Sequence, residues 1–330
     1  MSTQTPQNSR DSPIDVLVVG AGPAGLAFGT SIARLLHTCI IFSHNQFRNA
    51  KSQHMHGIPT WEHRSPAEFR SAARADILSH YSTTFFENFS ISSIEKHARD
   101  DGSSLFKAVD ENGKEWWGRK LVLASGVKDI MPDIEGYEEC WVSGIFHCLF
   151  CHGYEERGAA SAGVLAIDDC SPAPLALHFA RYANRLAGKI TIYTNGNEEV
   201  TKGIETALSQ LKAESKTRKN VTIVRRRIVK LVKLPKGAEI EVVLEGGEKK
   251  VEGFLAHKPK GEQHGPWAEQ LGLEMTDQGD IKVNPPFNAT SVPGVFAGGD
   301  CGVMMKTATV ALSNGGLLAA GVAAQLEAED

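Results

Sequence analysis

The sequence predicts an α/β protein with two doubly wound, three-layer domains, in which the second domain is inserted into the first. Residues 14–43 form an apolar run, a glycine-rich turn, a helical pattern and a second apolar run. The same strand, helix, strand order returns at residues 162–196, and residues 292–326 add a further strand and a long helix of small residues. Such alternation is typical of parallel sheets covered by helices on both faces.

Length, composition and charge fit two globular cores. The chain has 330 residues, of which 42% are hydrophobic and 22% charged, and these values are ordinary for globular domains. The formal net charge is −4, and the lysines and arginines are spread along the sequence. Because nucleic-acid-binding proteins concentrate positive charge on one face, we expect no nucleic-acid partner.

The two ends of the chain indicate neither secretion nor a membrane. Residues 1–13 are polar and lack the apolar core of a signal peptide, so they are interpreted as a flexible tail. We find no apolar stretch that approaches the ~18 residues needed to cross a bilayer, since GGLLAAGVAAQLE near the end is short and interrupted by glycine. We therefore expect a cytoplasmic protein without a membrane partner.

The first glycine-rich turn has the pattern of a dinucleotide site. Gly20 would form the tight turn, Gly22 would let the backbone approach a pyrophosphate, and Gly25 would allow the helix to pack closely on the strand. The helix N-terminus would then point its amides at the phosphates. A similar turn in a fold that binds no nucleotide is the alternative. The candidate contacts are Gly20, Gly22, Pro23, Ala24 and Gly25.

The end of the second apolar run departs from this pattern. An acidic residue usually holds the adenosine ribose there, but Ser43 and His44 occupy the position in this chain. Ser43 is therefore the candidate for a contact to the adenosine.

The segments that follow predict further elements of the first domain. Residues 68–90 have a helical and then a strand-like pattern, and residues 105–126 are typical of a hairpin that turns at Asn112 and Gly113 and continues as a buried strand. The segment MPDIEGYEE, with its proline and glycine, is interpreted as a hinge.

The second strand, helix, strand unit lacks the glycines of the first. Asp168 and Asp169 stand in its turn, where they would repel a pyrophosphate, and Pro172 and Pro174 begin its helix. The next strand ends in Tyr-Thr-Asn, without an arginine for a 2′-phosphate. We therefore expect this domain to bind NADPH poorly. Arginines 225–227 are predicted to lie on a strand of this domain, on its solvated face.

Two cysteines, Cys148 and Cys151, form a C-x-x-C between two histidines. The pair could hold a metal, form a structural disulfide or act in redox chemistry. A zinc site is disfavoured because zinc needs four ligands and no second C-x-x-C is present, and a structural disulfide is unusual in a reducing compartment. Of the other four, Cys39 and Cys170 are predicted to lie in the core, and Cys140 and Cys301 have no obvious partner in the sequence.

Three motifs together resemble the low-molecular-weight thioredoxin reductase family, which belongs to class II of the pyridine nucleotide-disulphide oxidoreductases. They are VGAGPAG near the start, the C-x-x-C after the hinge and GVFAGGD before the last helix, and the resemblance covers nearly the whole chain. It implies an FAD-binding domain at 14–126 and 258–330, an inserted domain of the NADPH-binding type at 127–257 that carries the cysteines, and a homodimer.

The resemblance also implies roles for single residues. Asp300 would bind the ribityl or phosphate part of FAD, and backbone amides near Thr307 and Ala308 would point at the flavin pyrimidine. Cys151 would lie nearer the flavin, and Cys148 would exchange with substrate. The further implied cofactor contacts are Arg48, Asn49, His56, Ala124 and Gly126.

Two departures indicate a branch of this family. The NADPH motifs G-x-G-x-x-A and H-R-R are missing, whereas CLFCHGYE and FRNAKSQHMHG resemble the fungal gliotoxin-type and bacterial holomycin-type dithiol oxidases. The resemblance implies oxidation of a small-molecule dithiol of the epidithiodiketopiperazine type to a cyclic disulfide, with electrons passing through FAD to oxygen and forming hydrogen peroxide. No resident metal is expected.

Histidines next to these motifs are candidates for proton transfer. His152 follows Cys151, and an imidazole near its ordinary pKa of ~6.5 can exchange protons with a thiol at neutral pH. Glu155 could orient it or could simply be solvated. His54 and His56 could line the flavin or substrate cleft, or could belong to a loop with its own hydrogen bonds.

Two other functions remain open. One is a thioredoxin-reductase-like enzyme that acts on a protein disulfide with another electron donor. The other is a flavin-loaded binding protein whose cysteine pair is idle.

Overall fold

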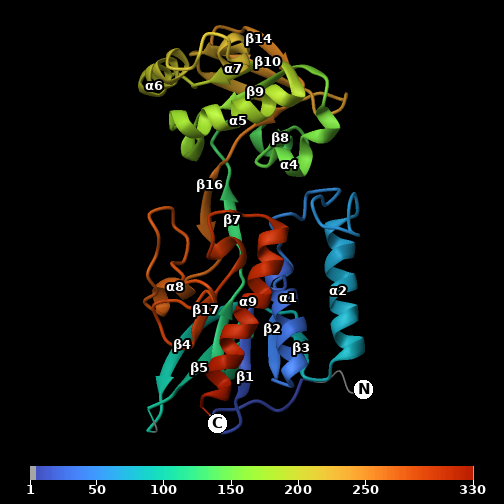
Figure 1. Cartoon of the computed structure of the whole chain (residues 1–330), viewed down its shortest axis with the longest axis vertical. Coiled ribbons are helices and arrows are strands. Elements are labelled where there is room, and N and C mark those ends of the chain that lie inside the picture. The colour runs from blue at the N-terminus through green and yellow to red at the C-terminus, as the bar shows by residue number, and fades with distance from the viewer. Residues whose placement is uncertain (1–4, 101, 330) are drawn as a thin grey trace. The chain divides into compact units, whose positions relative to one another are not determined.

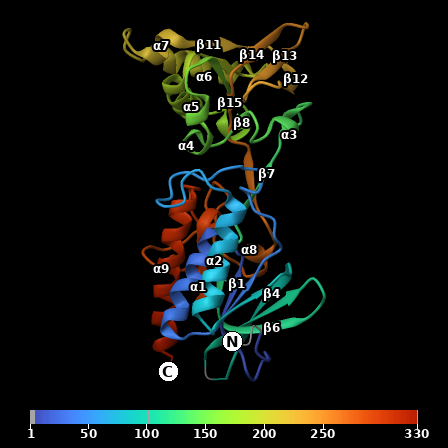
Figure 2. The same cartoon turned by 90° about the vertical axis from the view of Figure 1, so that its right-hand side faces the viewer.

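The computed structural model describes residues 5–100 and 102–329. The chain divides into two compact units, Met1–Lys128 with Gly261–Asp330, and Asp129–Lys260. Most of their elements are labelled in Figures 1 and 2. Strand β7 (Val127–Ile130) pairs with β16 (Lys260–Gln263) at the two points where the chain passes from one unit to the other.

The first unit is built on a seven-stranded sheet. Strands β3, β2, β1, β6 and β17 are parallel, whereas β4, β5 and β6 form an antiparallel meander. The turn between β5 and β6 contains Gly113 at φ 81°, as the sequence predicts. The strands are β1 (Ile14–Val19), β2 (Cys39–Phe42), β3 (Thr84–Glu87), β4 (Ile91–Ala98), β5 (Ser104–Asp110), β6 (Glu115–Leu123) and β17 (Val295–Ala297).

Two helices, α1 and α9, pack against each other on one face of this sheet (Figures 1 and 2). Their approach is close because α9 carries glycine at the contact: a Cβ on Gly315 would lie 2.5 Å from the carbonyl oxygen of Ala24. The helices of the unit are α1 (Pro23–Ile32), η1 (Ala33–Leu35), α2 (Pro66–His80), α8 (Trp267–Gln270), η4 (Gly299–Cys301) and α9 (Ala308–Glu327).

The expectation that no apolar stretch is long enough to cross a membrane is wrong for α9. Its 20 residues suffice by length and composition, because its glycines serve helix packing and do not interrupt the helix. Half of the helix is buried inside the protein, as in the core helix of a globular domain, so its length is weak evidence for a membrane span.

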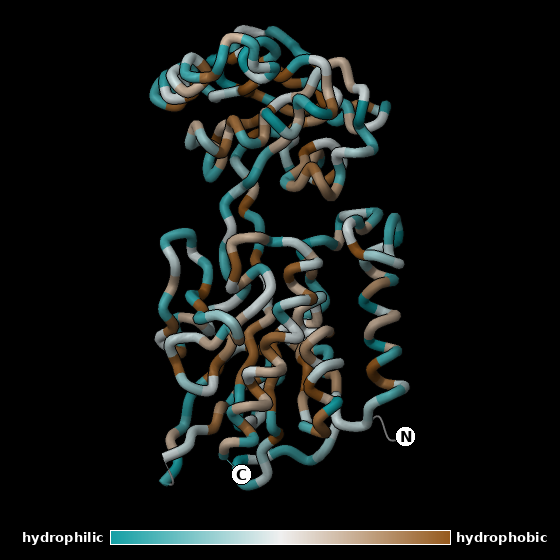
Figure 3. The backbone as a smooth tube through the Cα atoms, viewed as in Figure 1, coloured by the Kyte–Doolittle hydropathy of each residue, from teal (hydrophilic) through white to brown (hydrophobic). Residues whose placement is uncertain are grey.

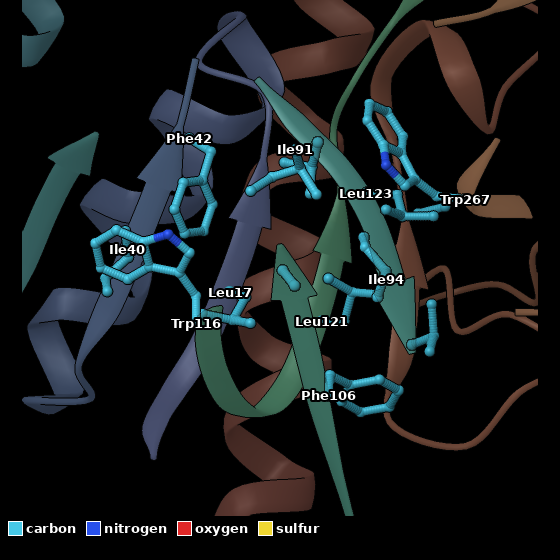
Figure 4. Packing of buried hydrophobic residues seen from close by; sticks show 14 of the residues in the cluster. Leu17, Ile40, Phe42, Ile91, Ile94, Phe106, Trp116, Leu121, Leu123 and Trp267 are labelled. Carbon is cyan, nitrogen blue, oxygen red and sulfur yellow. The ribbon is translucent and has the colours of Figure 1, made fainter. Parts of the chain in front are cut away.

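The other face of the sheet carries an aromatic and aliphatic core (Figure 4). Trp116 is fully buried against Phe42, with ring centroids 5.3 Å apart. Its indole Nε1 donates to Asp110 Oδ2 at 3.0 Å, and Asp110 Oδ1 accepts from the backbone N–H groups of Asn112 and Lys114. One buried carboxylate therefore fixes the hairpin turn and anchors the core.

The second unit has a five-stranded parallel sheet in the order β11, β10, β9, β15, β8. Helix α5 packs on one face, and the antiparallel sheet of β12, β13 and β14 covers the other through buried aliphatic residues. In Figure 3 brown, hydrophobic stretches alternate with teal, hydrophilic ones along the chain of this unit. The strands are β8 (Ile145–Phe146), β9 (Ala159–Leu165), β10 (Ala187–Tyr193), β11 (Val221–Val224), β12 (Ile228–Lys233), β13 (Ile240–Leu244), β14 (Lys249–Glu252) and β15 (Leu255–Ala256).

The predicted α/β fold with two Rossmann-like domains is confirmed. The remaining helices of the second unit are α3 (Tyr137–Cys140), α4 (Leu149–His152), η2 (Tyr154–Glu156), η3 (Asp168–Cys170), α5 (Ala173–Leu186), α6 (Glu198–Ser209) and α7 (Lys216–Asn220).

The three consecutive arginines are exposed as expected, but their placement on a strand is wrong. They occupy the connection between β11 and β12. Arg225 pairs with Glu205, and Arg226 pairs with Glu248.

Candidate redox and cofactor sites

Cys148 and Cys151 form a disulfide, with their Cα atoms 5.2 Å apart. Cys148 lies two residues after the end of β8 and is the N-cap of α4, where its carbonyl accepts from the N–H groups of Cys151 and His152. Gly153 ends this turn, where a Cβ would clash with the carbonyl of Leu149. The local fold thus brings the two sulfurs together on one short helical turn.

The disulfide is half-buried, and the other four cysteines are free and fully buried. Burial raises the pKa of the Cys39 and Cys170 thiols to about 12, so these two are inert at neutral pH. The accessible thiol chemistry of the described chain therefore lies at Cys148 and Cys151. While they are joined, neither sulfur is the thiolate that a metal site needs.

Aromatic contacts hold the histidines beside the disulfide. The His152 ring stacks on Phe146 with centroids 5.2 Å apart, and the His147 ring stacks on Trp141 at 5.6 Å. His152 ends α4, one residue after Cys151, so its imidazole is positioned by the same turn as the sulfurs.

In the first unit, the turn before α1 has the form that a dinucleotide requires. Gly20 has φ 113°, and a Cβ there would clash with the carbonyl of Ala124, while one on Gly25 would clash with the carbonyl of Gly20. Gly22 is the N-cap of α1 and uses no side chain. A Cβ on Gly22 would meet no atom within 4 Å among the described residues, so the backbone is open to a ligand.

A pocket of about 210 Å³ lies at the carboxyl ends of β1 and β2, where doubly wound folds bind the adenosine of a dinucleotide. The Trp267 indole lines it, and its buried Nε1 finds no acceptor in the part of the chain that the structure describes. His44 and His264 line it with their rings 5.1 Å apart, and burial lowers the pKa of His44. A buried donor without an acceptor fits a pocket that a ligand completes.

Ser43 lies beside this pocket and is buried. Its backbone N–H donates to the carbonyl of Glu87, and its hydroxyl lies 3.3 Å from Asn45 Oδ1. The open turn and the adenosine pocket together fit FAD.

The residues expected at the other end of the cofactor lie close together in space. Asp300 sits in η4, and its Oδ2 accepts from Arg48 Nη1 at 3.0 Å, so two expected cofactor contacts are paired with each other. Thr307 is the N-cap of α9, where its hydroxyl accepts from the N–H of Val310. Asn49 accepts from Arg70.

Lys306 is a residue of this site that the sequence did not indicate. Its ammonium group donates to Asp280 Oδ1 at 2.6 Å and to the carbonyls of Asp300 and Val303. Lys306 therefore fixes the turn that carries Asp300. A lysine after a motif has many possible partners, and Asp280 lies 26 residues upstream, so no local pattern could have identified the pair.

The loop with His54 and His56 has its own hydrogen bonds. His56 Nδ1 lies 2.5 Å from Glu62 Oε1, and Glu62 Oε2 accepts from the backbone N–H of Gly57. The bond with His56 lowers the pKa of the Glu62 carboxyl. The His54 ring stacks on His63 at 4.1 Å. Thr309 donates to the carbonyl of Gly57 at 3.5 Å, which ties this loop to the first turn of α9.

The turn after β9 differs from the open turn of the first unit. Asp169 forms a 2.9 Å ion pair with Lys258, and Asp168 adopts φ 47°. Below them, the fully buried His257 lies 2.6 Å from Tyr137 Oη and 3.3 Å from the carbonyl of Ile167. Two carboxylates, one of them in an ion pair, thus stand at the turn where a pyrophosphate would need bare amides.

Comparisons with known proteins agree with this architecture. The family model described as pyridine nucleotide-disulphide oxidoreductase matches residues 14–315. The chain is 42% identical over 314 residues to thioredoxin reductase aclD of Aspergillus oryzae, covering 94% of this chain and 96% of that one, and 40% identical over 317 residues to thioredoxin reductase sirT of Leptosphaeria maculans, covering 94% of each. The crystal structure of HlmI matches with a TM-score of 0.82 at 23% identity, covering 99% of this chain and 96% of HlmI, a likeness that shows the fold.

Proposed function

We propose a specific activity for this chain, which belongs to the pyridine nucleotide-disulphide oxidoreductase family and is a flavin oxidoreductase of the thioredoxin reductase type. The activity is oxidation of a small-molecule dithiol to a cyclic disulfide, with FAD as cofactor and oxygen as electron acceptor. Its substrate class is that of the epidithiodiketopiperazine secondary metabolites.

One observation carries this proposal: the unit with the accessible disulfide replaces the glycine turn of a nucleotide site with Asp168 and with Asp169 paired to Lys258. A carboxylate at that position repels a pyrophosphate, so NADPH is a poor electron donor here. A substrate that carries its own thiols needs no such donor, because it reduces the disulfide by exchange.

The proposed cycle begins at Cys148. A substrate thiolate attacks Cys148 Sγ, the bond to Cys151 breaks, and Cys151 leaves as a thiolate. The second substrate thiolate then attacks the substrate sulfur of the mixed disulfide, which closes the product ring and leaves both cysteines reduced. The substrate has lost two electrons and two protons.

His152 takes up one of these protons in the proposal, since its imidazole ends the turn that holds both sulfurs. FAD, when bound, accepts the two electrons from the cysteine pair and passes them with two protons to oxygen, forming hydrogen peroxide. The open turn at Gly22 and the pocket beside Trp267 would hold its pyrophosphate and adenosine, and Asp300 with the start of α9 would hold the flavin end.

The test compares electron donors on the purified protein. Small dithiols should bleach the visible flavin band without oxygen, and air should restore it with one hydrogen peroxide per dithiol, whereas NADPH alone should bleach it slowly. Cys148→Ser and Cys151→Ser should each abolish turnover while the flavin stays bound. Rapid bleaching by NADPH, or turnover that survives both substitutions, would refute the proposal.

A second candidate function is reduction or oxidation of a protein disulfide with an unconventional electron donor. The names of the fungal relatives favour it, and turnover that requires reduced thioredoxin in place of a small dithiol would support it. We also propose a cytoplasmic homodimer without a membrane or nucleic-acid partner, which light scattering and fractionation of cells would test.

A further inference from the structure

An aromatic side chain that is largely exposed to solvent lies in the sequence between the two redox cysteines. Phe150 is the third residue of the C-x-x-C segment and is 78% exposed, whereas its neighbour Leu149 is buried. A single exposed apolar side chain is common on protein surfaces. What separates Phe150 from this background is its place in the sequence between the two cysteines and the rings that continue from it.

Two further rings extend from Phe150 along α5. The Phe150 and Tyr182 rings meet edge to face, with centroids 5.4 Å apart and planes at 84°. His178 lies one helical turn before Tyr182, with ring centroids 4.3 Å apart, as expected for residues four positions apart on one helix face. The opposite face of α5 is buried in the core of the second unit through Leu177, among others.

We call these three side chains the ring platform: Tyr182 and His178 are carried by α5, and Phe150 by the turn that the disulfide closes. They are not needed to attach the cysteine turn to the domain. Leu149 already anchors that turn in the core, and Gly153 packs with its Cα towards Leu186. Anchoring of the turn thus leaves the exposure of Phe150 unexplained.

We propose that the ring platform of Phe150, Tyr182 and His178 binds a flat ring of the dithiol substrate while its sulfur reaches Cys148. This inference rests on the proposed function and narrows its substrate class to dithiols that carry an aromatic or similarly flat ring. Edge-to-face and offset-stacked contacts with Phe150 and Tyr182 would supply the attraction, and the His178 imidazole would face the polar part of the ring system.

The size of the platform favours a small molecule over a protein. One aromatic side chain buries roughly 150–250 Å², and Tyr182 is only 37% exposed. Even complete coverage of the three rings stays below the roughly 800 Å² that each partner buries in a stable protein–protein interface. A small ring, by contrast, needs only one or two such faces.

The chemical step is the exchange already described: the substrate sulfur forms a bond to Cys148 Sγ as the bond to Cys151 breaks. The platform contributes affinity and orientation only, so it should act on ring-bearing dithiols and leave others unaffected. Stopped-flow reduction of the holoenzyme without oxygen isolates this step. The probes are ortho-benzenedimethanethiol, which carries a ring, and dithiothreitol, which carries none.

Phe150→Ala should lower the second-order rate constant of reduction by ortho-benzenedimethanethiol about fivefold, the factor that corresponds to loss of one favourable ring contact. The rate constant with dithiothreitol should change less than twofold. Tyr182→Ala should lower the rate constant with ortho-benzenedimethanethiol about twofold to threefold and leave that with dithiothreitol unchanged. Phe150→Tyr, which keeps the ring, should retain the wild-type preference.

Tyr154→Ala is the matched control, because Tyr154 is a 66% exposed ring close to the cysteines in sequence that contacts Arg157 and lies outside the platform. The platform would be refuted if Phe150→Ala lowered the rate constant of reduction equally with both dithiols, or if Tyr154→Ala lowered it as much as Phe150→Ala. Either result would leave the proposed oxidase function unaffected. Faster reduction by reduced thioredoxin that depends on Phe150 would overturn it in favour of a protein substrate. Failure of both small dithiols to reduce the wild-type enzyme would refute the proposed function as well.

Discussion

Replacement of Lys306 should destabilise the first unit far more than an ordinary lysine substitution. The Lys306 and Asp280 side chains are only 14% and 9% exposed, and the ammonium group donates three hydrogen bonds, one to Asp280 and two to backbone carbonyls. Lys306→Met keeps the aliphatic stem but leaves Asp280 as a buried charge without its cation. Removal of one partner from a buried pair costs roughly 3–5 kcal/mol.

We expect Lys306→Met to lower the free energy of unfolding by about 3 kcal/mol, the lower end of that range, because the pair keeps some contact with solvent. Urea unfolding followed by far-UV circular dichroism measures this loss. Lys282→Met is the control: Lys282 pairs with Glu274 at 2.8 Å, but both side chains are more than half exposed, and such pairs contribute roughly 0–1 kcal/mol.

The double substitution Asp280→Asn with Lys306→Met should recover part of the loss, since no buried charge then remains. If Lys306→Met and Lys282→Met lower the free energy of unfolding equally, to within ~0.5 kcal/mol, the buried ion pair of Lys306 with Asp280 does not stabilise the Asp300 turn.

Three further predictions concern the cofactor turn, the pH response and the core. Gly22→Ala should leave the free energy of unfolding of the apoprotein within about 1 kcal/mol of wild type but weaken FAD binding about tenfold or more, whereas Gly20→Ala should prevent stable folding. Equilibrium dialysis measures FAD binding, and circular dichroism measures folding. Wild-type FAD affinity in Gly22→Ala would contradict the assignment of this turn to the FAD pyrophosphate. Burial lowers the pKa of His257 to about 4, so the unfolded chain binds the extra proton first as the pH falls. The free energy of unfolding should therefore fall by up to roughly 3 kcal/mol between pH 6.5 and pH 4, with no such loss above about pH 6.5. Unfolding curves of His257→Gln measured over the same pH range should lack this loss. Trp116→Phe should lower the free energy of unfolding by about 2 kcal/mol, because Asp110 then loses a buried hydrogen-bond donor. A thermal unfolding midpoint equal to that of wild type would contradict this prediction.

The sequence predicted the parts of the structure that depend on local pattern. The alternation of strands and helices, the hairpin turn at Gly113 and the tight turn at Gly20 follow from residues adjacent in the chain. Contacts between distant residues were not predictable in the same way. Arg48 and Asp300 are 252 positions apart, and both were expected to contact the cofactor, yet they contact each other.

The second unit gives the same lesson. The two acidic residues after β9 were recognised as unfavourable for a pyrophosphate, but the ion pair of Asp169 with Lys258 bridges 89 positions and depends on the fold. The platform ring Tyr182 likewise reaches Phe150 only because α5 packs on the sheet in the same core as the cysteine turn. For α9, the sequence predicted the helix but not that it is long and apolar enough to cross a membrane, because the glycines that contact α1 were interpreted as interruptions.

The division of the chain has a consequence for biosynthesis. Asp129–Lys260 is continuous and can collapse as soon as it leaves the ribosome, whereas the first unit also needs β17 and α9, which are translated after that segment. Until then the sheet face that α9 will cover stays open to water or to chaperones. Premature termination a few dozen codons early should therefore yield a folded middle segment on an unfinished, colourless and aggregation-prone remainder.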